Sequence, residues 1–309
     1  MRDWQRRVTA EPRIKDLPPG GFTPLLYAAR EGCVECARYL VEGGADIDLA
    51  DSYRVTPLVL AILNTRYDVA AYLISAGADV DKWDWWGRTP IYAAVDMNIL
   101  PVGGRTDLPS LDKTGALEVA EMLLTAGADP NLRLKNEPPL RNAVFDRGGD
   151  SQVLTIGATP LLRAAKAGDN AALRLLLAHG ARVDAANYTG VTPLMTAAGV
   201  GHGSNPTRGR YKTETEALES LELLLAAGAD INARGLGDQT ALHGAARKGW
   251  TQVAKYLIEH GADPAAVDAQ GLTALDYAMG KVSYGNLDAG QRHEDTVALL
   301  QPFAKATGR

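Results

Sequence analysis

The chain has 309 residues, of which 46% are hydrophobic, and a formal net charge of −5 at pH 7. This composition allows a long buried core, and the acidic balance argues against a nucleic-acid binder. No stretch reaches the roughly 18 apolar residues that a membrane-spanning helix needs, and residues 1–7 lack the apolar segment of a secretory signal. We therefore expect a cytoplasmic protein, with a periplasmic or secreted location as the alternative if a leader has been removed.

A short phrase recurs seven times along the chain. Its fullest copies read Thr-Pro-Leu followed by Ala-Ala, as at residues 23–29 and 159–165, and most successive copies are 33 residues apart. Threonine can accept a hydrogen bond from an unpaired N–H at a helix start, and proline suits the first helical position because it lacks an N–H. Each copy therefore predicts a helix start. The seven threonines are Thr23, Thr56, Thr89, Thr159, Thr192, Thr240 and Thr273.

A glycine follows most of these threonines 21 residues later, as at Gly44, Gly77 and Gly261. Glycine suits the left-handed position that ends a helix, and the interval leaves room for two short helices. Each unit is expected to be a helix pair followed by a turn, which gives an all-α repeat solenoid. The units start near residues 18, 51, 84, 154, 187, 235 and 268.

The pattern resembles the ankyrin-repeat family, whose signature is a 33-residue period with a T-P-L-H-x-A core. The match is closest at residues 240–246 and covers about residues 18–279, before a final helix near residues 294–303 that looks like a terminal cap. The resemblance implies about seven helix-turn-helix units joined by projecting finger turns. We expect one domain over residues 18–309, behind an N-terminal cap segment at residues 1–17.

The resemblance also implies a scaffold that binds a protein or peptide through its finger tips and concave first-helix face. It implies no cofactor, and we expect a monomer. The phrasing of the repeats looks like that of bacterial ankyrin proteins.

The period is broken in four places. Units three, five and seven carry insertions at residues 98–114, 200–214 and 280–293, and an extended finger at residues 134–156 separates units three and four. We expect the three insertions on one rim, where their cations form a secondary site for an anion or a partner. A small-molecule or anion binder is accordingly the alternative function. A competing interpretation is that these loops fold onto neighbouring helices and their cations cap helix ends. The cations of the secondary site are Arg105, Arg208, Arg210 and Lys212.

One finger turn is rich in tryptophan, since three of the five tryptophans lie within residues 83–86. Trp, Tyr and Arg are the residue types that dominate interface hot spots, so we interpret this turn and its surroundings as the partner site. The alternative is that the finger at 134–156 folds over the indoles and buries them. The expected partner-binding residues are Tyr27, Arg30, Tyr53, Arg54, Trp83, Trp85, Trp86 and Arg88.

Cysteine and histidine give no sign of chemistry. Cys33 and Cys36 form a C-x-x-C without a second cysteine pair, so we expect a buried Cys36 and a loop Cys33 and no metal or redox site. His243 falls on the histidine position of the ankyrin core and is expected to be structural. The chain lacks G-x-S-x-G, H-E-x-x-H and a phosphate-binding glycine loop. We therefore predict that it is not an enzyme.

Overall fold

The computed structural model describes residues 21–98, 112–138, 153–201, 212–281 and 291–306. Within these ranges the chain is helical, and one isolated β-bridge joins Val267 and Thr273. The segment expected as a cap at 1–17 and most of each expected insertion lie outside the described residues. No helix among the described residues is long and apolar enough to cross a membrane.

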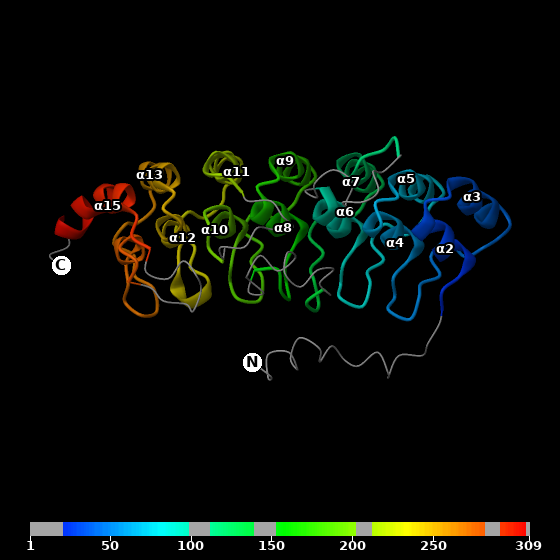
Figure 1. The fold of residues 1–309 in the computed structure, drawn as a ribbon, viewed down its shortest axis with the longest axis horizontal. Helices are drawn as coiled ribbons and strands as arrows, with labels where there is room; N and C mark the ends of the chain where they lie inside the picture. The colour runs from blue at the N-terminus through cyan, green and yellow to red at the C-terminus, as the bar shows by residue number, and fades with distance from the viewer. Residues whose placement is uncertain (1–20, 99–111, 139–152, 202–211, 282–290, 307–309) are drawn as a thin grey trace.

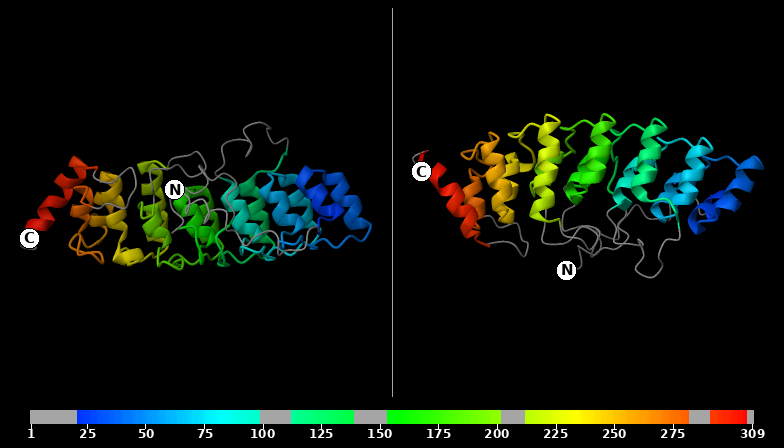
Figure 2. Two further views of the ribbon diagram at one scale, coloured as in Figure 1. Left: turned by 60° about the horizontal axis from the view of Figure 1, so that its bottom comes forward. Right: turned by 90° about the horizontal axis from the view of Figure 1, so that it is seen from above.

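The described helices stack in two parallel rows, with the connecting turns projecting beyond the first row (Figure 1). Figure 2 shows from two further sides how successive helix pairs follow one another along the stack. The first row contains α2 (Pro24–Glu31), α4 (Pro57–Leu63), α6 (Pro90–Asn98), α8 (Pro160–Ala167), α10 (Pro193–Ala197), α12 (Ala241–Lys248) and α14 (Ala274–Ala278). The second row contains α3 (Val34–Glu42), α5 (Tyr67–Ser75), α7 (Ala116–Thr125), α9 (Asn170–Ala178), α11 (Glu214–Ala226), α13 (Thr251–Glu259) and α15 (Glu294–Ala306).

The helix starts follow the predicted threonine caps. Oγ1 of Thr23 accepts a hydrogen bond from the N–H of Leu26 at 3.2 Å, and Thr159 caps α8 in the same way. At the turns, Gly44 and Gly77 have φ of 88°, the left-handed conformation that glycine adopts without a steric penalty. The predicted repeat solenoid of helix pairs is therefore confirmed.

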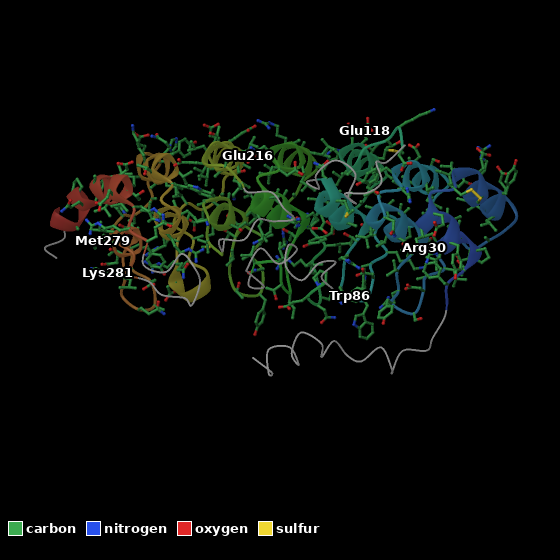
Figure 3. The ribbon with its side chains drawn as sticks, in the orientation of Figure 1. Arg30, Trp86, Glu118, Glu216, Met279 and Lys281 are labelled. Carbon is green, nitrogen blue, oxygen red and sulfur yellow. A yellow bond between two sulfur atoms is a disulfide. The ribbon has the colours of Figure 1, made fainter. Side chains whose placement is uncertain are left out.

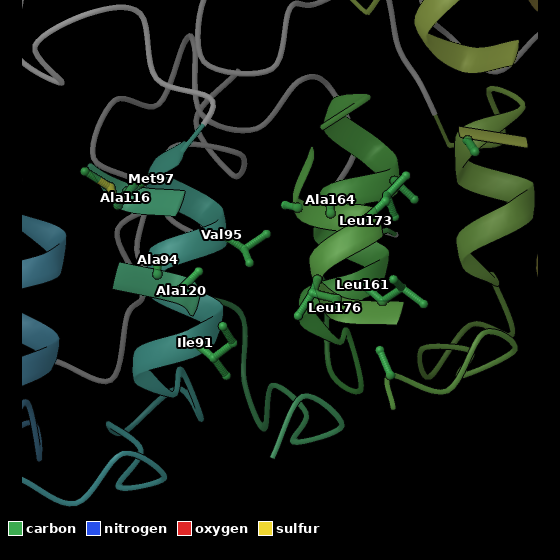
Figure 4. Close-up of a cluster of buried hydrophobic side chains, with 14 of the residues drawn as sticks. Ile91, Ala94, Val95, Met97, Ala116, Ala120, Leu161, Ala164, Leu173 and Leu176 are labelled. Atoms are coloured by element: carbon green, nitrogen blue, oxygen red, sulfur yellow. The ribbon is translucent and has the colours of Figure 1, made fainter. Parts of the chain in front are cut away.

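The core lies between the two rows and continues from pair to pair. Figure 4 shows Ile91 and Val95 of α6 on the side toward α8, and both are buried, as are Leu161 and Ala164 of α8. Alanine at many of these positions lets neighbouring helices approach closely. Each pair thus buries its apolar surface against its neighbours, which is how repeat arrays are stabilised.

One expectation about burial is wrong. Cys36 is exposed and forms a disulfide with Cys33, the N-cap of α3, while the next residue, Ala37, is buried. The matching position in a later unit is Val253, which is fully buried because α13 packs between α11 and α15. Among the described second-row helices α3 packs only on α5, so no described helix of that row covers its outer face.

Gly244 tests how tightly the first row is packed. A Cβ at Gly244 would lie 2.5 Å from the backbone N of Val200 and 2.9 Å from the carbonyl carbon of Gly199. We expect Gly244→Ala to lower the free energy of unfolding by about 1–3 kcal/mol, although alanine is the better helix former by about 1 kcal/mol. Chemical denaturation measures this loss. A gain in stability would show that α10 and α12 separate at little cost.

Candidate functional site

Two neighbouring finger turns, residues 51–56 and 84–89, present the aromatic side chains. In the first, Asp51 accepts hydrogen bonds from the N–H groups of Tyr53 and Val55, both at 2.9 Å. Burial raises the pKa of Asp51, and these two hydrogen bonds offset only part of that rise. In the second turn, Asp84 accepts from the N–H groups of Trp86 and Arg88 at 3.0 and 2.9 Å. An aspartate inside each loop therefore fixes the backbone that carries the side chains.

Trp86 packs against residues of both turns and helps hold their aromatic side chains in place. Its ring stacks on Tyr53 with centroids 5.6 Å apart, and the guanidinium carbon of Arg88 lies 5.0 Å from the Trp86 centroid. Nε of Arg88 donates to Asp84 at 2.7 Å, and Asp84 is fully buried. Arg88 is 8% exposed. It therefore supports the Trp86 ring through the cation–π contact and offers a partner little surface.

Trp83 and Trp85 face outward to different degrees. Trp85 is 42% exposed, while its backbone N–H donates to the carbonyl of Tyr53 at 2.8 Å. The half-buried Trp83 is contacted by Arg54 from the preceding finger and by Lys135 from the following one. We call this surface the fingertip patch; it consists of Tyr53, Arg54, Trp83, Trp85, Trp86 and Lys135.

The described part of the extended finger runs beside the fingertip patch without burying Trp85. The N–H groups of Lys135 and Asn136 both donate to the carbonyl of Trp86, at 2.9 and 3.1 Å. Leu134 and Val153 are buried in a separate apolar cluster. The apolar residues in this part of the finger therefore pack there and not on the tryptophans. The rest of this finger, residues 139–152, lies outside the described residues.

Tyr27 and Arg30 form a second exposed group in the first unit. Tyr27 is 51% exposed and meets Phe22 edge to face at 4.7 Å. The guanidinium carbon of Arg30 lies 5.0 Å from the Tyr27 centroid and 5.3 Å from that of Phe22. In Figure 3 the label of Arg30 lies at α2 and that of Trp86 among the turns. Sequence reasoning missed Phe22, which precedes the first threonine.

Lys212 cannot serve the secondary site as expected. Its Nζ donates to the carbonyls of Ala165, Thr196 and Ala197 at 3.1, 2.9 and 2.8 Å, which uses all three donors of an ammonium group. Burial lowers the pKa of Lys212 well below its usual 10.5, and Lys166 contributes to that shift. Arg105, Arg208 and Arg210 lie outside the described residues.

Two other side chains contact carbonyls near the ends of first-row helices. Nε of Arg66 donates to the carbonyl of Arg30 at 3.2 Å, beyond Gly32 at the end of α2. Nε2 of His293 lies 3.0 Å from the carbonyl of Arg247, near the end of α12. Both side chains therefore fill hydrogen-bond positions that the end of a helix leaves open.

A buried ion pair on the first-helix row was not identified from the sequence. Nε of Arg163 on α8 donates to Asp96 on α6 at 2.5 Å, and Arg163 is 1% exposed. Among the described residues, the two terminal nitrogens of Arg163 have no hydrogen-bond partner. Arg163 lies four residues after Thr159, just as Tyr27 lies four residues after Thr23, so the repeat phase could have indicated its face.

A hollow in the described surface lies away from the aromatic turns. Its volume is about 730 Å³, and its lining includes Ile74 at α5 and Glu118 and Met122 on α7. Glu118 appears among the second-row helices in Figure 3. No tryptophan or arginine is among the described residues that line this hollow, so it does not support the small-molecule alternative built on the insertion loops.

Removing the carboxylate of Asp84 should show how far the fingertip patch depends on its support. Asp84→Ala leaves the buried guanidinium of Arg88 uncompensated, and we expect a loss of about 3–5 kcal/mol in unfolding free energy. The control is Asp46→Ala, because Asp46 is exposed and accepts one N–H, from Asp48. Equal losses for the two variants in urea denaturation would contradict a supporting role for Asp84.

Comparison with known proteins gives a consistent result. A family model described as "Ankyrin repeats (3 copies)" matches residues 7–84, 113–204 and 212–300. Ankyrin repeat and SOCS box protein 11 of Danio rerio is 36% identical over 118 residues, which are 38% of this chain and 35% of that protein. The matched region thus spans about a third of this relative's length.

Solved structures extend the similarity to most of the chain. The ankyrin repeat domain of human ASB11 superposes with a TM-score of 0.60 at 23% identity, covering 90% of this chain and 97% of that one. An ankyrin repeat domain from Acinetobacter baumannii AYE has a TM-score of 0.58 at 25% identity, covering 78% and 98%. At these sequence identities, the solved structures indicate a shared fold.

Proposed function

Because the chain belongs to the ankyrin-repeat family, whose repeats are protein–protein interaction modules, we propose that it binds a protein or peptide partner through its fingertip patch. One observation carries this placement: Trp85 is a 42% exposed indole on a turn held by hydrogen bonds on both sides. A large aromatic side chain on a rigid support can contribute contact area with little loss of conformational freedom.

The surroundings of Trp85 are suited to a polypeptide. The stacked pair of Tyr53 and Trp86 lies beside it, and Arg54 and Lys135 provide exposed charge at its edge. Hot spots typically combine an apolar anchor with such a polar rim. Tyr27 and Arg30, in the first unit, would extend the contact along the first-helix row.

The remaining features of the proposal concern the whole protein. We propose that it acts as a monomeric cytoplasmic adaptor without catalysis of its own, without a cofactor and without nucleic acid as ligand. The acidic net charge of −5 supports the last point. The similarity to an Acinetobacter baumannii domain supports a bacterial source, which the repeat phrasing also suggests.

Trp85→Ala tests the placement of the site. The wild-type chain and the variant are used to capture partners from a lysate of the source organism, after circular dichroism has shown that both are folded. We expect the captured partner to lose at least about 2 kcal/mol of affinity, or about thirtyfold in Kd, because hot-spot aromatics lose this much on truncation. The affinity is then measured with the purified partner.

Tyr188→Ala is the matched control. Tyr188 is 81% exposed on a later finger, so it offers a similar ring at a different place along the stack. Its removal is expected to change Kd less than about threefold, that is, by less than about 0.7 kcal/mol. A partner that binds wild type and Trp85→Ala equally well would refute the fingertip patch as the docking site.

A further inference from the structure

We propose that Arg54 and Lys135 form a cationic clamp around Trp83 that binds an acidic side chain of the partner polypeptide. The proposal rests on the function proposed above, because it specifies the chemistry that the fingertip patch recognises. The three residues that form the clamp come from three successive fingers.

The geometry of the clamp is set by the neighbouring fingers. The guanidinium carbon of Arg54 lies 4.1 Å from the Trp83 ring centroid, and Nζ of Lys135 lies 3.0 Å from it. The electron-rich face of an indole attracts cations at such distances. Trp83 therefore holds both positive charges against the same indole side chain.

The two charges have no anion beside them among the described residues. No ion pair or side-chain hydrogen bond joins the charged group of Arg54 or Lys135 to a carboxylate there. The nearby carboxylates are already engaged, since Asp51 accepts two N–H groups of its own turn and Asp84 pairs with Arg88. Arg54 and Lys135 are both exposed, so an external carboxylate can reach them.

The backbone of Arg54 gives a second, independent indication. Arg54 has a φ of 61°, in the left-handed region, two residues before the cap threonine of its unit. At the same place other units have glycine, as at Gly87, Gly157 and Gly271, with φ of 81°, 84° and 76°. One further unit has Asp238 there, and aspartate tolerates this conformation better than most residues. Arginine at a strained glycine position suggests that its side chain is needed there.

The surroundings favour a polypeptide carboxylate over other anions. Trp85 and the stacked pair of Tyr53 and Trp86 lie next to the clamp and provide apolar surface for residues that flank an acidic side chain. Guanidinium and ammonium groups both bind carboxylates through charge-assisted hydrogen bonds.

The clamp is tested with fluorescein-labelled decaglutamate as the probe, followed by fluorescence anisotropy, with decaglutamine as the uncharged counterpart. We expect wild type to bind decaglutamate at least tenfold more tightly than decaglutamine. Arg54→Gly and Lys135→Met should each raise the decaglutamate Kd at least threefold, and both together at least tenfold, which is about 1.4 kcal/mol. Arg182→Met, at an exposed arginine outside the fingertip patch, is the matched control and should change Kd less than twofold.

Arg54→Gly also separates loss of binding from loss of fold. Glycine relieves the strained backbone, so the melting temperature of this variant should equal or exceed that of wild type. The clamp is overturned if wild type does not discriminate decaglutamate from decaglutamine, or if the double variant binds no worse than Arg182→Met. It is equally overturned if 10 mM inorganic phosphate displaces the probe completely, or if a decathymidylate binds as tightly as decaglutamate.

Trp85→Ala in the same assay distinguishes failure of the clamp from failure of the proposed docking site. Decaglutamate has no apolar side chain for Trp85, so its Kd should stay within twofold of wild type. If partner capture survives Trp85→Ala while decaglutamate binding still depends on Arg54 and Lys135, the docking site is wrong and the clamp stands. If partner capture depends on Trp85 but the decaglutamate Kd does not change in the Arg54 and Lys135 variants, the clamp is wrong and the docking site stands.

Discussion

The backbone hydrogen bonds between neighbouring fingers are the interactions on which the fingertip patch depends. Trp85 N–H donates to the Tyr53 carbonyl, and Lys135 N–H donates to the Trp86 carbonyl. These two bonds fix the relative position of three turns that are distant in sequence. The stack of Tyr53 on Trp86 and the contacts of Arg54 and Lys135 with Trp83 both follow from that register. A shift of one finger would separate the rings and the cations together.

The nearest carbonyl or carboxylate decides the role of several arginines and lysines in this fold. Lys212 and Arg66 lie beyond the ends of first-row helices, where free carbonyls accept their protons. Arg88 lies inside a turn that already contains Asp84, so it becomes part of the support. Arg54 and Lys135 extend from finger tips where no described carbonyl or carboxylate binds their charged groups, and both side chains are exposed.

The sequence predicted what depends on local chemistry. Threonine caps and turn glycines act within a few residues, so the helix starts and the stacked fold could be read directly, as could the aromatic turn at 83–86. What depends on contacts between units could not be read in this way. The exposure of Cys36 follows from its place at the edge of the second row, and the role of Lys135 follows from its approach to Trp83 across a finger boundary.

Nearest-neighbour stacking also limits how far the strain at Arg54 can spread. In a repeat array each unit contacts only the units beside it, so a left-handed arginine in one turn weakens a single finger and leaves the distant helix pairs unchanged. A glycine would suit that turn better, as it does in other units of this chain. The array can therefore carry an unfavourable residue at its surface while the buried rows supply the stability. An acidic group bound between Arg54 and Lys135 would bridge fingers on either side of Trp83, and it would oppose the repulsion of the two cations where the hydrogen bonds between fingers hold them together.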